Sequence, residues 1–187
     1  LDVLTPAAVS TIIDHGPWDA LVYLVHGMGG DDFAENDRIA ARHVATAIEQ
    51  GAIARVVYVS GIIPEVDEAN LSEHLRSRLE VERILSDSAA TVVTLRAAMI
   101  VGAASTSFEL MAQLAARLPV TVVPDWMKTR VEPLAVVDLV AAILGALAAD
   151  VSTGHWDVGG GESLPYPELI ERYTTHAQCE RPQLSVP

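Results

Sequence analysis

Short apolar runs that do not alternate with polar residues recur along the chain, and helical patterns separate them. Ala20 to His26 and Val56 to Val59 are such runs, and a further strand is expected at Thr91 to Arg96. Because a strand with one solvated face alternates apolar and polar residues, these runs indicate strands that are covered on both faces. The pattern therefore predicts an α/β chain, in which a doubly wound parallel sheet carries helices on both faces.

Other segments fit the same alternation. We expect the tail of a strand at Leu1 to Leu4 and a helix from Pro6 to His15, with Thr5 as its N-cap. A second helix is predicted from Asp32, its cap, to about Gln50. The remaining predictions are helices at Thr106–Arg117, Leu134–Ala149 and Tyr166–Ala177, and strands at Val120–Val123 and His155–Val158.

The stretch from Ala54 to Leu85 is the best candidate for a functional site. Its strand ends at Ser60 and Gly61, and ligands of open α/β sheets bind beyond the carboxyl ends of the strands. A helix follows, for which Asn70 and Glu73 form a capping-box pattern. On that helix His74 and Arg78 are four residues apart and share one face.

His74-Leu-Arg-Ser-Arg78 resembles the Y-x-x-x-K signature of the short-chain dehydrogenase/reductase superfamily, and looks like its atypical branch of NAD(P)H-binding, nitrogen-metabolite-repression-regulator-like proteins. Thr94 to Gly102 is similar to the family's L-R-P-x-x-x-x-G strand, and Val131 to Val140 to its later helix start. Gly159 to Leu169 is similar to its G-G-x-E-x-L-T-Y-x-E-L segment. The resemblance covers nearly the whole chain and implies a Rossmann-like fold.

The resemblance also implies a cofactor, NAD or NADP. Asp2 and Val3 match the residues with which the family contacts adenine at the end of its third strand. His26 and Gly27 match the loop beside the nicotinamide ribose, whereas a histidine at a strand end more often packs or bonds to the backbone. The further cofactor positions that the resemblance gives are Arg78 and Ala98.

The family's catalytic groups are a Ser that orients the substrate carbonyl, a Tyr that transfers the proton and a Lys beside it. The Ser position falls near Ile62, so that Ser60 is the nearest candidate hydroxyl. His74 replaces Tyr and has a reference pKa of about 6.5, which suits proton transfer. Arg78 replaces Lys and binds oxygen atoms without titrating. An alternative is a solvated helix face on which Arg78 pairs with Glu82.

Two classes of function remain open. One is an NAD(P)-dependent oxidoreductase or isomerase that acts on a small organic substrate through His74 and Arg78. The other is a non-catalytic dinucleotide-sensing module, or a scaffold, and the combined loss of Ser, Tyr and Lys favours this second class.

No counterpart of the family's first strand, glycine-rich turn and first helix occurs in residues 1–187, so we expect one incomplete domain that binds a dinucleotide poorly. The missing strands would leave the Leu1–Leu4 and Ala20–His26 strands with unpaired edges. We therefore expect a homodimer, or pairing with the missing strands.

The composition of the chain argues against several classes of partner. The net charge of -13, with only 12 Lys and Arg, argues against nucleic acid. The most apolar stretch, Leu134 to Ala149, is shorter than the roughly 20 residues of a membrane span and contains Asp138. The single cysteine, Cys179, fits a reducing cytoplasm, and the six histidines show no metal-ligand spacing, so that no metal site is expected.

Overall fold

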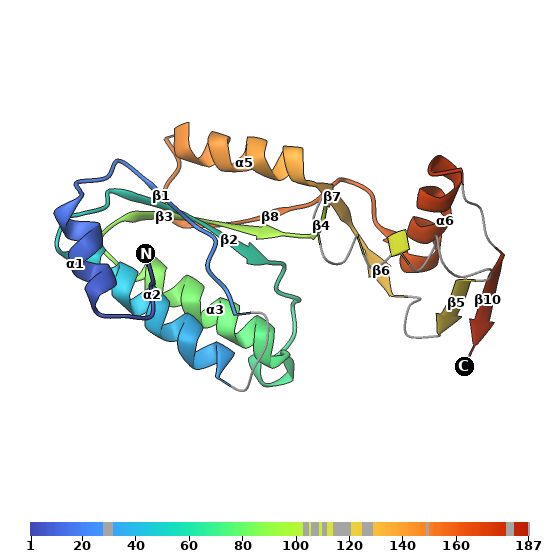
Figure 1. Cartoon of the computed structure of the whole chain (residues 1–187), viewed down its shortest axis with the longest axis horizontal. Coiled ribbons are helices and arrows are strands. Elements are labelled where there is room, and N and C mark those ends of the chain that lie inside the picture. The colour runs from blue at the N-terminus through green and yellow to red at the C-terminus, as the bar shows by residue number, and fades with distance from the viewer. Residues whose placement is uncertain are drawn as a thin grey trace. The chain divides into compact units, whose positions relative to one another are not determined.

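The computed structural model describes residues 1–27, 32–102, 105, 109, 112–113, 121–124, 129–148, 150–178 and 182–186. The chain forms two compact units (Figure 1). The first unit comprises Leu1–Ala97 and Ala141–Val158, and the second comprises Ala98–Val140 and Gly159–Pro187. Each unit is described separately below.

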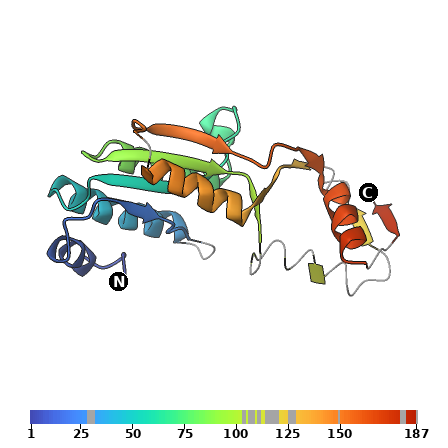
Figure 2. The same cartoon turned by 90° about the horizontal axis from the view of Figure 1, so that it is seen from above.

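The first unit is built on a four-stranded sheet. Its strands are β1 (Leu21–Tyr23), β2 (Arg55–Gly61), β3 (Thr91–Ala97) and β8 (Gly154–Val158), in the spatial order β1-β2-β3-β8. All three pairings are parallel, and Val57 lies between Val22 of β1 and Val93 of β3. The prediction of a Rossmann-like parallel sheet is therefore confirmed. Figure 2 shows the strands side by side.

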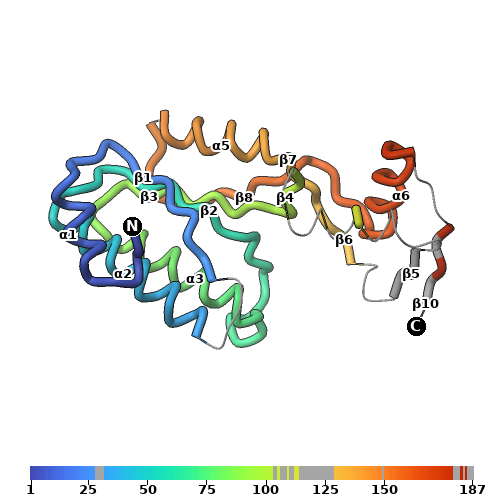
Figure 3. Tube along the Cα trace, in the orientation of Figure 1, coloured from blue at the N-terminus to red at the C-terminus, as the bar shows by residue number. Residues whose placement is uncertain are grey.

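Helices cover both faces of this sheet, as predicted. Helices α2 (Phe33–Glu49) and α3 (Glu73–Ser86) lie on one face, and α5 (Val136–Ala148) lies on the other (Figure 1). Helix α1 (Ala7–Asp14) packs against α2. The trace in Figure 3 leaves the first unit after β3 and re-enters it within α5.

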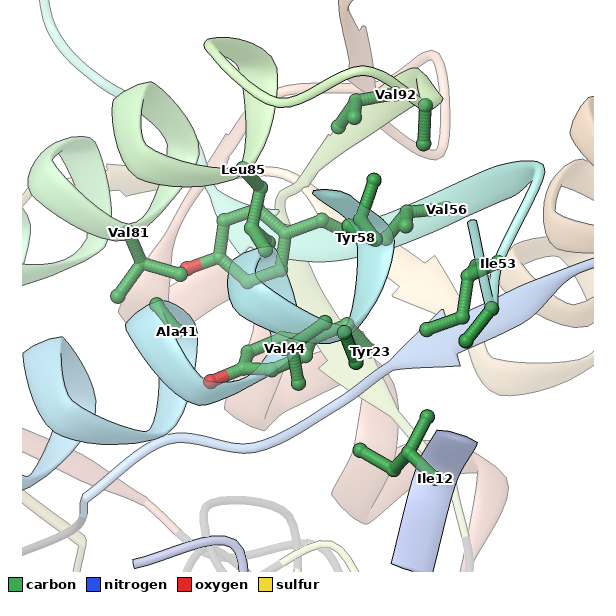
Figure 4. Close-up of a cluster of buried hydrophobic side chains, with 14 residues drawn as sticks. Ile12, Tyr23, Ala41, Val44, Ile53, Val56, Tyr58, Val81, Leu85 and Val92 are labelled. Carbon is green, nitrogen blue, oxygen red and sulfur yellow. The ribbon is translucent and has the colours of Figure 1, made fainter. Parts of the chain in front are cut away.

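The two sides of β2 supply the two halves of the core. Val56 and Tyr58 point towards α2 and α3, whereas Val57 points towards α5. All three are at most 1% exposed, which is why this run lacks polar alternation. Figure 4 shows Tyr58 packed among Val81, Leu85 and other apolar side chains of the larger cluster.

The described residues of the second unit include short paired strands and helix α6. Strand β4 (Met99–Val101) pairs in parallel with β7 (Pro133–Ala135), and β6 (Arg130–Val131) pairs antiparallel with β9 (Leu164–Pro165). Strand β5 (Thr121–Pro124) pairs in parallel with β10 (Gln183–Val186), and helix α6 spans Tyr166–His176.

A very close backbone approach fixes one turn of the second unit. A side chain at Gly160 would overlap the carbonyl oxygen of Pro133, and one at Gly159 would overlap the carboxylate of Glu132. That carboxylate accepts a hydrogen bond of 2.8 Å from the backbone N–H of Gly161. The glycine run is thus required by close packing.

Three local predictions are wrong. Leu1 to Leu4 forms a turn instead of a strand, because the Asp2 carboxylate accepts a hydrogen bond from the Leu4 N–H and the Asp2 carbonyl accepts one from Thr5. The cap of α1 is Pro6 and not Thr5. The predicted helix from Leu134 begins at Val136, because Pro133–Ala135 pairs as strand β7.

The predicted capping box is also wrong. Asn70 ends a short 3₁₀ helix, η1 (Glu68–Asn70), and Ser72 is the cap of α3. The predicted helix at Thr106–Arg117 falls mostly outside the described residues. Among the helices that are described, none has the length and apolar character to cross a membrane.

Candidate functional site

The candidate site lies at the carboxyl ends of β1 and β2, where an open parallel sheet offers its loops to a ligand. Gly27 follows β1, and Ser60 and Gly61 end β2. Helices α2 and α3 begin beside these ends and contact each other along their lengths. Together they bring residues distant in sequence to one edge of the first unit.

His74 is stacked on an aromatic ring. Its imidazole lies parallel to the Phe33 ring, with 4.2 Å between the ring centroids and 21° between the planes. Phe33 is 7% exposed, whereas His74 is exposed on the first turn of α3. The stack therefore fixes the plane of the imidazole while leaving it open to solvent or a ligand.

A buried carboxylate joins the loop after β1 to both helices. Asp37 of α2 is 5% exposed and accepts a hydrogen bond of 2.6 Å from the Gly27 N–H. Its second oxygen accepts a hydrogen bond of 2.9 Å from the Ser77 hydroxyl of α3. A side chain at Gly27 would lie 2.7 Å from the Cβ of Phe33, so this position requires glycine.

Sequence reasoning missed Asp37, Ser77 and Phe33, although a signal for Asp37 was present. Asp37 shares the apolar face of its helix with Ala40, Ala41 and Val44, all of which are buried. A carboxylate on an apolar face must find donors when it is buried. The Asp37 carboxylate finds these donors in the Gly27 N–H after β1 and in the Ser77 hydroxyl of α3.

Arg78 lies beside the end of β2. Its side chain is half-buried, with Cδ 3.8 Å from where a Gly61 Cβ would stand. The alternative pairing with Glu82 is not formed, since both oxygens of Glu82 bind Arg96 at 2.8 and 3.0 Å. The Arg78 guanidinium makes no hydrogen bond or ion pair with any described residue.

Beneath Arg78 lie two buried tyrosines. The Tyr58 hydroxyl donates a weak hydrogen bond of 3.5 Å to the carbonyl oxygen of Arg78. The Tyr23 and Tyr58 rings meet edge to face, with 5.6 Å between their centroids. Burial raises the pKa of Tyr58 to about 12 and raises the pKa of Tyr23 as well. Both phenols are therefore neutral at physiological pH.

Ser60 and the histidine after β1 have contrasting environments. Ser60 is 3% exposed, and its hydroxyl has no partner among the described residues. The Ser60 side chain is therefore buried at the carboxyl end of β2. His26 is exposed, and its Nδ1 lies 3.1 Å from the carbonyl oxygen of Leu24.

The remaining predicted cofactor residues are Asp2, Val3 and Ala98. The strand end on which the assignment of Asp2 and Val3 rested is absent, and the Val3 carbonyl oxygen lies 2.7 Å from Nδ1 of His43 on α2. Ala98 directly follows Ala97, which pairs with Gly61 at the carboxyl end of β2. The described residues contain no cluster of three or more His, Cys, Asp or Glu that would hold a metal ion.

Comparison with known proteins finds no matching family model and no matching curated sequence. Solved structures do match. The RMD protein of Pseudomonas aeruginosa, complexed with NADPH, is 18% identical with a TM-score of 0.79, over 98% of this chain and 75% of that one. The enzyme WbmG of Bordetella bronchiseptica, in complex with NAD, is 18% identical with a TM-score of 0.82, over 100% and 65%.

A third match is the UDP-glucose 4-epimerase of Thermotoga maritima with UDP-glucose, at 11% identity and a TM-score of 0.81, over 100% of this chain and 70% of that one. The chain thus spans about two thirds to three quarters of the length of these three proteins. At these identities the likeness establishes the architecture. The chain has the Rossmann-like fold of these NAD(P)-complexed and nucleotide-sugar-bound proteins.

Proposed function

We propose that this chain belongs to the atypical short-chain dehydrogenases/reductases and binds NAD or NADP, acting as an oxidoreductase or isomerase on a small organic substrate. The observation that carries the proposal is the Arg78 guanidinium, half-buried beside Gly61 and without a described protein acceptor. Arginine presents five donors in a planar fork, which suits the oxygen atoms of a ribose or an acidic group. The shared fold with the NAD- and NADPH-complexed proteins supports the same ligand class.

The described residues fit one part of such a cofactor. In this proposal Arg78 and the loop at Gly27 hold the nicotinamide ribose, and the hydrogen bond from the Gly27 N–H to the buried Asp37 supports it by fixing that loop. Residues 1–187 contain no G-x-G-x-x-G sequence to receive the pyrophosphate. A bound nicotinamide would supply the capacity to accept or donate a hydride.

His74 is the proton-transfer group in this proposal. It is exposed at the same helix face as Arg78, and the Phe33 stack restricts its ring to one plane. Fixing the ring reduces the orientational freedom lost when a substrate hydroxyl or carbonyl approaches. An imidazole is the side chain that most commonly gives or takes a proton near neutral pH in proteins.

A second candidate is a dinucleotide-sensing module without turnover. The burial of Ser60 favours it, because a hydroxyl held inside the sheet end does not reach a substrate carbonyl. Ile62, which stands at the family's Ser position, offers no donor. Both candidates share the binding role of Arg78 and differ in the role of His74.

Ligand titration followed by amide NMR shifts tests the shared binding role, since it reports weak binding. We expect NADH to bind the 187-residue chain with a dissociation constant of about 1 mM or weaker. Reduced nicotinamide mononucleotide should bind within a few-fold of NADH, because no pyrophosphate cradle distinguishes them. The shifts should centre on Gly61 and Arg78.

Substitution of Arg78 makes the test specific. Arg78→Ala should weaken binding by about tenfold or more, the effect of losing a charge-assisted hydrogen bond. Arg76→Ala is the matched control, since Arg76 is exposed on the same helix, and it should leave binding unchanged. Equal affinities for both variants would overturn the assignment of Arg78. A micromolar dissociation constant for NADH would contradict the proposal that the described residues hold only the nicotinamide ribose end of the cofactor.

A further inference from the structure

Two residues of α2 hold the glycine that follows β1. Phe33 and Asp37 are four positions apart, so they lie on one face of the helix. The Gly27 N–H donates its hydrogen bond of 2.6 Å to the Asp37 carboxylate. On the same glycine, a Cβ would stand 2.7 Å from the Cβ of Phe33 and 3.2 Å from its Cα. The backbone at Gly27 is therefore bonded to Asp37 and in direct contact with Phe33.

The same two residues of α2 also contact α3, which lies beside it (Figure 1). Phe33 stacks on the His74 imidazole, with 4.2 Å between the ring centroids. Asp37 accepts a hydrogen bond of 2.9 Å from the Ser77 hydroxyl. Because His74 and Ser77 are three positions apart, they lie on one face of α3. Two connections thus run from Gly27 to α3, an apolar link through Phe33 and a polar link through Asp37.

Burial makes both links stiff. Phe33, Asp37 and Ser77 are each at most 7% exposed. Closely packed side chains leave no free space, so a displacement of one group is passed to its neighbours. No gap separates Gly27 from Phe33, and Phe33 therefore has to follow any movement of Gly27 towards α2. The His74 imidazole is exposed at the far end of the apolar link, so it is the group that is free to respond.

We propose that Phe33 is a positioning residue that links the orientation of the His74 imidazole to the loop after β1. The inference rests on the proposed function, in which Gly27 and Arg78 hold a nucleotide ribose. A ribose held there steadies Gly27 and, through Phe33, the imidazole. Coupling between two sites is reciprocal, so an ordered imidazole strengthens binding at the loop to the same extent. The proton-transfer group is thus ordered when the loop is occupied.

The first test needs no ligand and follows the order parameter of the His74 ring by carbon-13 NMR relaxation. In the native chain it should be close to the value of a rigid group, about 0.85. Phe33→Leu keeps an apolar side chain but removes the stack, so the value should fall below about 0.6, which is typical of a flexible group. Phe33→Tyr restores a ring and should restore the order. The polar link through Asp37 remains in both variants, so α3 keeps its position.

The second test addresses the link itself. Gly27→Ala adds a Cβ that has to displace Phe33, so it should lower the order of the His74 ring in the native chain. In the Phe33→Leu background the same change should have little further effect, because the stack is already lost. Gly145→Ala is the matched control, since no atom lies within 4 Å of the added Cβ, and it should leave the His74 ring unaffected. Far-UV circular dichroism verifies that every variant is folded.

A third test measures the reciprocal effect on binding. Reduced nicotinamide mononucleotide is titrated and followed by the Arg78 amide shift. Phe33→Leu should weaken its binding about fivefold, the lower end of the usual coupling between sites, whereas Phe33→Tyr should bind like the native chain. Val44→Ala is the control, because it removes buried apolar volume from the same helix without touching either link, and it should leave the affinity unchanged.

Three results would overturn the proposal. The first is an ordered His74 ring in Phe33→Leu, and the second is a His74 ring that does not respond to Gly27→Ala in the native chain. The third is an equal loss of affinity in Val44→Ala and Phe33→Leu, which would reflect general destabilisation. A native chain whose Arg78 amide does not respond to the nucleotide would instead contradict the proposed function, and the measurements without ligand still decide the role of Phe33.

Discussion

Asp37 reaches back ten residues to Gly27, whose backbone N–H donates a hydrogen bond of 2.6 Å to the Asp37 carboxylate. The same carboxylate binds the Ser77 hydroxyl, which lies on α3 between His74 and Arg78. One buried side chain thus sets the position of a loop and of a helix at the candidate site. Its removal would leave the buried Ser77 hydroxyl and the half-buried Gly27 N–H without this acceptor.

Asp37→Ala should therefore lower the free energy of unfolding by about 1–3 kcal/mol, the cost of leaving a buried polar group unsatisfied. Asp37→Asn should lower the free energy of unfolding by less, because its amide oxygen still accepts one hydrogen bond. Asp32→Ala is the control, since Asp32 is exposed and its side chain makes no capping hydrogen bond. It should change the free energy by less than about 0.5 kcal/mol. Urea unfolding measures all three, and equal losses for Asp32 and Asp37 would refute the bridging role.

Replacement of His74 separates the enzyme from the sensing module. If His74 transfers a proton, His74→Ala should lower turnover by roughly 10²-fold, the range for losing a general acid or base. The assay follows NAD(P)H fluorescence for net oxidation or reduction and product NMR for isomerisation. Glu73→Ala, at the exposed neighbouring position, serves as the control. Undiminished turnover in His74→Ala would exclude this role, and nucleotide binding without turnover in the unsubstituted chain would favour the sensor.

The start of α3 yields a stability prediction that distinguishes two polar residues, Asn70 and Ser72, which are two positions apart. The Ser72 hydroxyl accepts a hydrogen bond of 3.3 Å from the Leu75 N–H. Ser72→Ala should cost about 1 kcal/mol of unfolding free energy, the usual effect of losing a helix cap. Asn70→Ala should be nearly neutral, because the Asn70 side chain caps nothing in the structure. A larger loss at Asn70 than at Ser72 would restore the capping box expected from the sequence.

Stability should also fall at alkaline pH. Burial raises the pKa of Tyr58 from 10.0 to about 12, so the folded chain keeps the phenol proton at pH values where the unfolded chain releases it. The stabilisation is complete below pH 10 and is lost as the pH rises towards 12. Tyr58→Phe should flatten this part of the curve, with Tyr166→Phe as a control outside the first unit. Urea unfolding between pH 8 and about 12 measures it, and an unchanged slope in Tyr58→Phe would show that another group is responsible.

Hydrophobic pattern predicts the sheet of the first unit well, because burial on both faces leaves a direct mark on the sequence. The unalternating run at Val56 became β2 for that reason. The N-terminal strand failed because local hydrogen bonds of Asp2 compete with pairing. The hydrophobic pattern of the sequence contains no signal for such local hydrogen bonds.

The candidate site was predicted only in part. The spacing of His74 and Arg78 is visible in the sequence, since both lie on one helix. Their surroundings are not, because Phe33 and Asp37 come from α2, some forty residues earlier, and meet α3 only through packing. Choice between Asn70 and Ser72 as the cap likewise depends on where the 3₁₀ turn ends.

The division of the first unit into two chain segments has a consequence for synthesis on the ribosome. Residues up to Ala97 emerge first, with one sheet face already covered by α2 and α3. The other face, at Val57, Val93 and Leu95, has to wait for Ala142 to Leu147 of α5, and β3 waits for β8. The nascent chain therefore passes through a stage with an apolar sheet face open to water while at least forty-four further residues are added. That interval is when this protein has most need of a chaperone.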